Sequence, residues 1–410
     1  MSPKHLGVWL EDARVATLDV RRPWDLRCRY ERQAVATGVA NRPLLSCSLP
    51  VTRQAASATA WVRGLLPEGD HLLALATRAK VPTNYYADLL ERYGRDIAGA
   101  FSISTHAPEP RLWAVEPYSD DELVDELHLA VDAPGFAVRD DSELSIAGLQ
   151  NKLLVVALPG GRWGRPRNGH PSTHIMKLAD GRHDGLLAAE HACMKLARAV
   201  GLTTVTTNLA LFDGIEALIV ERYDRETDPN TDTIRRIHQE DACQALGINI
   251  DAHQGRGKYE RFGGPSFAQI AELLDRYGDP IIEHQRLLRT VVFTSIIGNA
   301  DAHGKNVSLL LDTTTGGVEL APLYDTVPTT LWPKLRAEPA MSVNHELAWP
   351  SFDGLIREAN QWGLRALTAE RVVDEMITDV RRVVASCDHV AVAKLVSSRL
   401  TALDKSRTST

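Results

Sequence analysis

The chain has 410 residues and a formal net charge of −7, with 44% hydrophobic and 24% charged residues. This composition is typical of a folded globular protein, and the length predicts two or three packed units. The acidic balance argues against the whole chain acting alone as a nucleic-acid binder. The five cysteines form neither a CxxC pair nor a zinc-like Cys/His cluster, so they indicate reduced thiols in a cytoplasmic protein.

The N-terminal segment MSPKHLGVWLEDARVATLDV alternates apolar and polar residues and lacks the apolar run of a signal peptide. No stretch of eighteen apolar residues occurs, so we expect no transmembrane helix and no membrane association.

The first 105 residues predict a small α/β subdomain. Strand-like alternation extends to about residue 50, and a helical stretch from Ala60 to Thr77 is broken by a turn at Leu65–Gly69. A further helix is expected to end near Gly94. Residues 106–141 carry prolines and acidic residues and are expected to form a connecting region.

The remainder predicts a sheet-rich lobe followed by a helical lobe. Residues 142–240 contain apolar strands and one helix that stops at Gly201. Residues 241–403 are mostly helical, with a hairpin at Val307–Pro322, and residues 404–410 are expected to be a disordered tail. This order outlines an α+β, two-lobed fold of the protein-kinase type.

The sharpest chemical signal is the loop NADAHGKN, which follows an apolar helix. Phosphoryl transfer requires a carboxylate that orients the attacking hydroxyl and oxygen ligands that hold Mg²⁺ on the phosphates of ATP. Asp301 and Asn306 have the spacing of the base and first metal ligand in a kinase loop, and Asp325 follows the hairpin as second metal ligand. The alternative is that Asp301 and Asn306 only cap a turn. Thr326 and Val327 replace the Phe-Gly that usually follows the second metal ligand, which leaves any DFG-type regulation in doubt.

Lys177 lies in the apolar strand THIMKLAD, where an ammonium group is costly unless it meets an anion such as the phosphates of ATP. Glu190, on the next helix, stands where a kinase glutamate pairs with that lysine. The alternatives are an edge-strand lysine that points to solvent and an ordinary helix-surface glutamate.

Two further segments are candidates for nucleotide binding. A loop with a single glycine, Gly148, precedes a strand, and its backbone amides together with Gln150 and Lys152 suit a phosphate cradle, although without further context a plain hairpin turn fits better. The strand ending in ERYDRE suits a hinge against adenine, bracketed by Glu221 and Tyr223. The alternative is that Tyr223 packs and the neighbouring arginines Arg222 and Arg225 lie on the surface.

These segments resemble the HipA family in content and order. The matching motifs are SxAGxQxK at Ser145–Lys152, HIMKL at His174–Leu178, ERYDR at Glu221–Arg225, QEDACQALG at Gln239–Gly247, KYE…GGPSF at Lys258–Phe267, NADAHGKN at Asn299–Asn306 and APLYDTV at Ala321–Val327. GLLPEGD at Gly64–Asp70 and RYGRDIAGAF at Arg92–Phe101 resemble the family's N-terminal subdomain.

The resemblance implies a kinase fold related to phosphoinositide kinases, ATP and Mg²⁺ as cofactors, and phosphorylation of protein serine or threonine. It implies that Asp301 is the catalytic aspartate and that Lys177 contacts ATP. It adds Ser145 and Ala147 to the nucleotide-binding loop and makes Ser145 an autophosphorylation site. A phosphoserine there would carry about −1.5 to −2 charges beside the triphosphate and would repel it.

The resemblance also implies partners. Family members act as toxins that pair with a helix-turn-helix antitoxin of the HipB type, reach operator DNA mainly through that antitoxin, and phosphorylate a protein of translation such as an aminoacyl-tRNA synthetase. The acidic chain fits a toxin that leaves DNA binding to a basic partner.

His303 and Lys305 are less defined members of the predicted catalytic set. His303 lies either near the transferred phosphate or in a supporting position, and Lys305 either neutralises charge on the γ-phosphoryl group or faces solvent. The competing functions are a small-molecule kinase and a pseudokinase that only binds a repressor. The Arg-rich stretch Arg21–Arg32 is interpreted as an ordinary solvated face.

Overall fold

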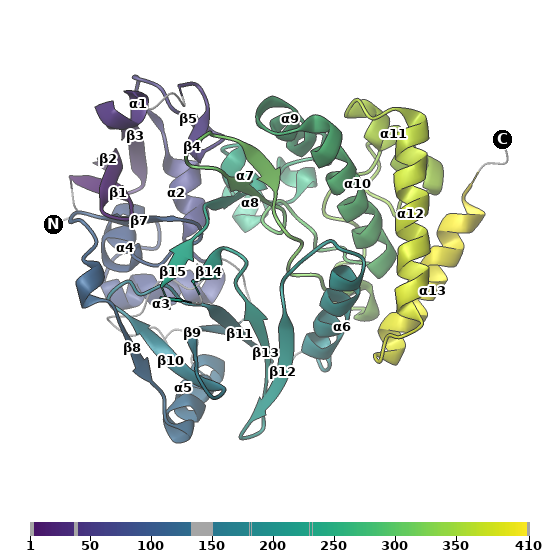
Figure 1. Cartoon of the computed structure of the whole chain (residues 1–410), viewed down its shortest axis with the longest axis horizontal. Coiled ribbons are helices and arrows are strands. Elements are labelled where there is room, and N and C mark those ends of the chain that lie inside the picture. Colours follow the sequence, from purple (N-terminus) through teal and green to yellow (C-terminus); the bar gives the residue numbers. More distant parts are fainter. Residues whose placement is uncertain are drawn as a thin grey trace. The chain divides into compact units, whose positions relative to one another are not determined.

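The computed structural model describes residues 4–36, 40–132, 151–179, 181, 183–228, 230–231 and 233–407 (Figure 1). The chain forms two compact units, each assembled from separate stretches of sequence. Unit 1 comprises residues 1–182, 208–240 and 311–317, and unit 2 comprises residues 183–207, 241–310 and 318–410.

Unit 1 begins with a five-stranded sheet in the order β6-β3-β2-β1-β7. Its strands are β1 (His5–Leu10), β2 (Ala13–Arg22), β3 (Asp25–Tyr30), β6 (Ala56–Ser57) and β7 (Phe101–Ser104). In β3 the alternate residues Leu26, Cys28 and Tyr30 are buried, as expected for a strand with one face against a core.

Four helices and a small hairpin complete this subdomain: α1 (Arg32–Ala36), β4 (Pro43–Ser46), β5 (Leu49–Pro50), α2 (Thr59–Leu65), α3 (Gly69–Ala79) and α4 (Tyr86–Tyr93). The predicted break at Leu65–Gly69 is confirmed, because α2 ends at Leu65 and α3 begins at Gly69. Side chains of α2, α3 and α4 join those of the sheet in one apolar core.

The second sheet of unit 1 has six strands in the order β12-β13-β11-β9-β10-β8. They are β8 (Ala114–Pro117), β9 (Lys152–Leu158), β10 (Arg162–Arg167), β11 (His174–Leu178), β12 (Thr207–Phe212) and β13 (Ile215–Glu221). Helix α5 (Asp120–Asp132) buries Leu123 and Leu127 in a core shared with Val155 and Met176 of this sheet. Three short strands follow: β14 (Arg225–Thr227), β15 (Ile234–Arg236) and β16 (Gln239–Asp241).

The segment expected to be a connection carries ordered elements. A 3₁₀ turn (Pro110–Leu112) precedes the edge strand β8, and α5 follows. Three of the acidic residues that suggested a linker, Asp120, Asp121 and Glu122, lie in the first turn of α5, where negative charge interacts favourably with the helix dipole. Ser119 caps that turn together with Glu122.

Unit 2 is mainly helical. Its elements are α6 (Leu186–Ala199), α7 (Ala242–Ala245), α8 (Ala252–Gly255), a 3₁₀ turn (Glu260–Phe262), α9 (Phe267–Tyr277), α10 (Pro280–Ile297), β17 (Ser308–Leu311), β18 (Val318–Leu320), a second 3₁₀ turn (Thr329–Leu331), α11 (Phe352–Gln361), α12 (Ala366–Val384) and α13 (Val390–Lys405). Figure 1 shows α10, α12 and α13 side by side, and all three helices contact one another.

Helix α10 is largely buried within unit 2, and the predicted catalytic loop follows it directly. Asp279 accepts hydrogen bonds from the first-turn amides, Pro280 occupies the first helical position, and Gly298 ends the helix in a left-handed conformation. The predicted tail starts too early, because α13 continues to Lys405. In the described part of the chain, no helix combines the length and the apolar character needed to cross a membrane.

Candidate active site

The loop from Asn299 to Asn306 is held in a tight turn by its own polar groups. The Asn299 Oδ1 accepts from the Asp301 amide at 3.0 Å, and the Asn306 Nδ2 donates to the Asp301 carbonyl at 3.0 Å. The His303 amide also donates to the Asp301 carbonyl at 2.8 Å. Asn306 therefore does close a turn, as the alternative interpretation proposed, while its amide oxygen is a group that suits a cation.

The Asp301 carboxylate contacts a residue outside this turn. Its Oδ1 accepts a 2.7 Å hydrogen bond from the Tyr259 hydroxyl. Burial raises the pKa of Asp301 above its ordinary value, and the nearby charge of Asp325 acts in the same direction. The Tyr259 hydrogen bond and the charge of Lys258 oppose that rise. A partly desolvated carboxylate of this kind suits a group that takes a proton.

His303 is buried, and its ring lies edge-on to Tyr259 with the ring centroids 5.2 Å apart. Burial lowers the pKa of His303 well below its usual range, with the positive charge of Lys258 as the next cause. The imidazole is therefore neutral at neutral pH, which fits a packing or hydrogen-bonding role better than that of a charged group.

Lys305 is buried, so the interpretation that it faces solvent is wrong. Its Nζ lies 2.6 Å from the Oδ2 of Asp241, and the other carboxylate oxygen of Asp241 caps α7 in a capping box with Gln244. This ion pair fastens the predicted catalytic loop to α7. A contact of Lys305 with the transferred phosphate stays a prediction.

The same loop is packed against its neighbours without spare room. The Ala242 amide donates to the carbonyls of Gly304 and Val307 at 3.0 and 2.9 Å. A Cβ on Gly304 would lie 2.2 Å from Pro265 and 2.7 Å from the sulfur of Cys243. Residues of the motifs QEDACQALG and GGPSF therefore pack directly against the loop.

Asp325 lies beyond β18 in the same unit and adopts a positive φ of 55°. Its carbonyl accepts a long, 3.5 Å hydrogen bond from the Asn299 side chain, which links it to the catalytic loop. Its charge acts on both Asp301 and His303. Asp325 and Asn306 supply the carboxylate and amide oxygens that Mg²⁺ prefers, and a cation here would relieve the mutual repulsion of Asp301 and Asp325. The residues present thus fit the predicted ion.

Lys177 and Glu190 are both buried, so the alternatives of a solvent-facing lysine on an edge strand and of a helix-surface glutamate are wrong. Lys177 lies on β11, an inner strand between β13 and β9, with 8% of its surface exposed. Glu190 lies on α6 with 1% exposed. Lys177 belongs to unit 1 and Glu190 to unit 2, and their pairing stays a prediction.

The predicted phosphate loop is only partly described. Ser145, Ala147, Gly148 and Gln150 lie outside the described residues, and Lys152 opens β9 in a half-buried position. At the predicted hinge, Glu221 ends β13 and is exposed, and the Tyr223 hydroxyl donates to the Gln239 side chain at 2.7 Å. Their contact with a nucleotide remains a prediction.

The arginines beside the hinge are buried, which overturns their interpretation as surface residues. Arg222 contacts Asp224 through two bonds of 2.9 and 2.8 Å, and Arg225 contacts Asp96 and Asp224 at 2.8 Å each. Asp96 also accepts from Ser172, and the surrounding arginines hold the pKa of Asp96 at about 2 in spite of its burial. The motifs RYGRDIAGAF and ERYDR meet in this cluster. Both motifs are recognisable in the sequence, but their contact spans more than a hundred positions and has no local signal.

Tyr259 and Asp241 are further site residues that sequence analysis missed. Both lie inside motifs that carried the family resemblance, and that was the only available signal. Their partners Asp301 and Lys305 are separated from them by 42 and 64 positions, so no local spacing reveals the contacts.

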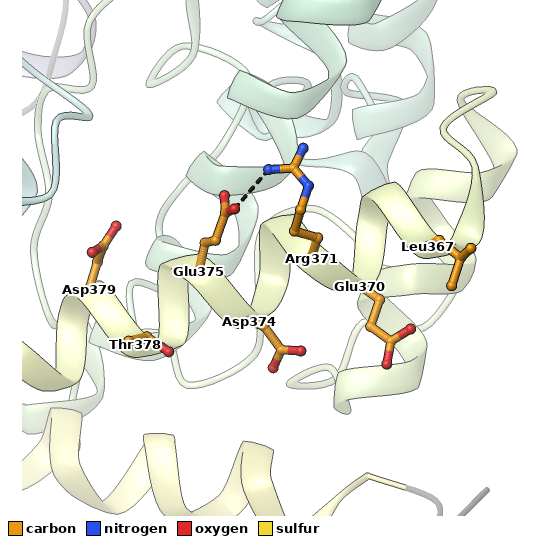
Figure 2. A pocket seen from close by; sticks show the side chains of 7 residues that line it. All are labelled: Leu367, Glu370, Arg371, Asp374, Glu375, Thr378 and Asp379. Atoms are coloured by element: carbon orange, nitrogen blue, oxygen red, sulfur yellow. Dashed lines mark hydrogen bonds and ion pairs between the residues drawn. The ribbon is translucent and has the colours of Figure 1, made fainter.

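A shallow hollow on α12 offers no comparable chemistry. Figure 2 shows its lining, which consists of Leu367, Glu370, Arg371, Asp374, Glu375, Thr378 and Asp379. Arg371 contacts Glu375 at 2.7 Å, Arg407 contacts Asp374, and Arg382 contacts Asp379 at 2.8 Å. This is a solvated helix face on which most of the charged side chains are paired.

Comparison with known proteins identifies relatives over nearly the whole chain. Residues 6–104 match the family model of the HipA N-terminal domain, and residues 144–385 match that of the HipA-like C-terminal domain. "Putative kinase Y4mE" of Sinorhizobium fredii is 33% identical over 398 residues, which cover 94% of this chain and 92% of that protein. "Serine/threonine-protein kinase toxin HipA" of Shewanella oneidensis is 30% identical over 296 residues, which cover 69% of this chain and 65% of the relative.

A solved structure has the same fold. It is HipA in the complex of the Shewanella oneidensis MR-1 toxin–antitoxin system with HipB and its operator DNA. The match has a TM-score of 0.78 at 25% identity and covers 97% of this chain and 95% of that chain. The α+β, kinase-like fold predicted from the sequence is thereby confirmed, and the chain belongs to the HipA family.

Proposed function

We propose that this chain is an ATP- and Mg²⁺-dependent protein kinase that phosphorylates serine or threonine and acts as the toxin of a toxin–antitoxin pair. The observation that carries the proposal is the environment of Asp301. Its partly buried carboxylate lies in a loop fixed by Asn306 and within electrostatic reach of Asp325. That is the set of groups that phosphoryl transfer to a hydroxyl requires.

In the proposed reaction Asp301 orients the substrate hydroxyl and takes its proton as the oxygen attacks the γ-phosphorus of ATP. The bond from that phosphorus to the β–γ bridging oxygen breaks, and ADP leaves with the electron pair. Asn306 and Asp325 would hold Mg²⁺, which would neutralise negative charge on the phosphates. Lys177 contacts the α- and β-phosphates.

The nucleotide-binding loop of Ser145, Ala147, Gly148, Gln150 and Lys152 covers the phosphates, and Glu221 and Tyr223 flank the adenine. Autophosphorylation of Ser145 switches the enzyme off by charge repulsion. His303 supports the loop as a neutral ring, and Lys305 acts at the γ-phosphoryl group or, through Asp241, as an anchor of the loop.

The proposed partner is a helix-turn-helix antitoxin of the HipB type. The support is the Shewanella oneidensis structure, which is a complex of HipA with HipB and operator DNA. The net charge of −7 favours DNA binding through a basic partner rather than by this chain alone. We further propose a cytoplasmic location and a substrate among the proteins of translation, such as an aminoacyl-tRNA synthetase.

Mass spectrometry of the intact protein and its peptides tests the proposal after incubation with ATP and Mg²⁺. The expected result is one phosphate on Ser145 in the wild type and none in Asp301→Asn. Phosphate absent from both would contradict the kinase assignment for this chain. Nucleotide binding without transfer would then favour a pseudokinase, and turnover of a metabolite would favour a small-molecule kinase.

A further inference from the structure

The hydroxyl of Tyr259 is bonded directly to the proposed base. It donates to the Asp301 Oδ1 at 2.7 Å, a distance typical of a strong hydrogen bond from a hydroxyl to a carboxylate. A carboxylate on a short side chain can rotate about its last bond, and this hydrogen bond restricts that rotation. Oδ2 then remains as the oxygen that meets a substrate hydroxyl.

The Tyr259 ring is itself held by its surroundings. The His303 ring meets it edge-on, with an interplanar angle of 82°. The Arg336 guanidinium lies 4.7 Å from the ring centroid, and the Lys258 ammonium lies 5.9 Å from it. Edge-to-face aromatic contacts and cations over a ring each favour a defined ring position.

The backbone around Tyr259 is fastened on two sides. The Lys258 carbonyl accepts from the Gly304 amide of the catalytic loop at 3.1 Å. On the other side, the Glu260 amide donates to the Ala340 carbonyl at 3.2 Å, and the Glu260 carboxylate accepts from the Ser342 hydroxyl at 2.7 Å. The phenol therefore projects from a backbone that is tied both to the loop it serves and to the chain beyond Asp325.

We propose that Tyr259 is a positioning residue for phosphoryl transfer, which fixes the Asp301 carboxylate so that one oxygen faces the acceptor hydroxyl. This inference rests on the proposed kinase function. Tyr259 does not touch the nucleotide in this role, so its hydroxyl affects the transfer step and leaves ATP binding unchanged. Loss of orientation at a reacting group costs rate even when every reacting group is present.

The test compares Tyr259→Phe with the wild type in the rate of Ser145 phosphorylation across a series of ATP concentrations at saturating Mg²⁺. The expected result is a roughly 10-fold lower maximal rate, with the ATP concentration for half-maximal rate changed less than about twofold. In the Asp301→Asn background, Tyr259→Phe should lower the residual rate no further, because the group that it positions is already replaced.

Tyr30→Phe is the matched control. Like the Tyr259 hydroxyl, the Tyr30 hydroxyl donates one hydrogen bond, in its case to the Leu49 carbonyl in the N-terminal subdomain of unit 1. Its removal should lower the thermal midpoint and leave the maximal transfer rate unchanged.

Three results would overturn the inference. A maximal rate unchanged in Tyr259→Phe would leave the phenol a purely structural group, whatever happens to the thermal midpoint. A raised maximal rate would show that Tyr259 obstructs the base. A raised half-maximal ATP concentration at unchanged maximal rate would place Tyr259 in nucleotide binding. Absence of transfer in the wild type would instead defeat the proposed function, and the inference with it.

Discussion

At the scale of single residues, burial sets the chemistry of the groups in and around the catalytic loop. It raises the pKa of Asp301 and lowers that of His303, so both side chains are biased toward their neutral forms. Lys258 and the Tyr259 hydroxyl act against this bias at Asp301. These two groups favour the anion of Asp301 in a place where burial makes an anion costly, which suits a base.

Asp301→Asn should abolish phosphate transfer while leaving the fold intact. The amide has the size of the carboxylate but cannot take the proton of the attacking hydroxyl. Phosphate incorporation should fall by at least about 100-fold, which general-base loss typically costs, with the thermal midpoint within a few degrees of the wild type. Asp388→Asn is the control, because it removes only an exposed ion pair with Lys195. Full activity in Asp301→Asn would refute the base assignment.

His238 provides a pH-dependent stability that can be measured without any activity. Burial lowers its pKa to about 4. The ring lies between the Leu45 carbonyl, 2.9 Å from Nε2, and the Ala100 amide, which donates to Nδ1. The unfolded chain takes up this proton near pH 6.5 and the folded chain only near pH 4. The contribution of His238 to the free energy of unfolding should therefore be fully present above pH 6.5, and it should fall by roughly 3 kcal/mol as the pH decreases to 4.

Denaturant unfolding at pH 7, 6, 5 and 4.5 measures this slope. His238→Gln is the comparison, because a glutamine can still donate to Leu45 but does not titrate. The difference between the two proteins isolates the histidine, since carboxylates such as Asp96 contribute equally to both. Identical slopes for the two proteins would mean that His238 is not held neutral in the folded state.

At the scale of elements, the buried Asp96–Arg222–Asp224–Arg225 cluster joins the link between α4 and β7 to the end of β13 and the start of β14. Four charged side chains with almost no exposed surface are tolerated because each is paired and hydrogen-bonded. The predicted hinge residue Tyr223 lies between two members of this cluster.

Asp96→Asn should be strongly destabilising, because it leaves the buried guanidinium of Arg225 without a full counter-charge. The expected loss in free energy of unfolding is about 3–5 kcal/mol. Asp19→Asn serves as the control, since Asp19 pairs with Arg29 and His5 near the surface and should cost less than about 1 kcal/mol. Equal losses in the two variants, measured by denaturant titration, would contradict the importance of burial here.

Elements with local signals were predicted well. The break between α2 and α3, the end of α4 near Gly94 and the stop of α6 before Gly201 all follow from turn residues and apolar periodicity. The ordered segment Pro110–Asp132 was missed, because acidic residues in a first helical turn resemble a linker when they are considered without the sheet that the helix covers. The burial of Arg222 and Arg225 was missed because Asp96 is more than a hundred positions away.

At the scale of the whole molecule, the two compact units do not coincide with the order of the sequence. Unit 1 contains both the N-terminal subdomain and the six-stranded sheet with Lys177. Spacing within the chain predicted Asp301, Asn306 and Asp325 as one group, and the structure brings their loop and Asp325 together in unit 2. The residues that pack against that loop could not be predicted, because they are distant from it in the sequence.

Removal of residues 1–105 should prevent the remainder from folding as a stable kinase. The deletion takes away Asp96 from the buried cluster and the Leu45 carbonyl from His238. We expect aggregation, or a broad thermal transition without cooperative unfolding, in circular dichroism. A truncation after Arg407 is the control and should unfold like the wild type. A deletion variant with a sharp, native-like transition would show that the sheet with Lys177 is independent of the N-terminal subdomain.

The discontinuity of unit 1 has a consequence for synthesis on the ribosome. Arg42 donates to the Gly316 carbonyl, so the first subdomain has a contact with a residue made much later. The Leu311 amide likewise donates to the carbonyl of His238, which belongs to the same unit. The ion pair between Asp96 and Arg225 likewise cannot form until Arg225 has been translated. The nascent chain therefore cannot complete unit 1 until residue 317 is available, by which point the loop carrying Asp301 has also been translated. The proposed kinase activity would thus appear only late in translation, and premature termination would yield fragments that lack it.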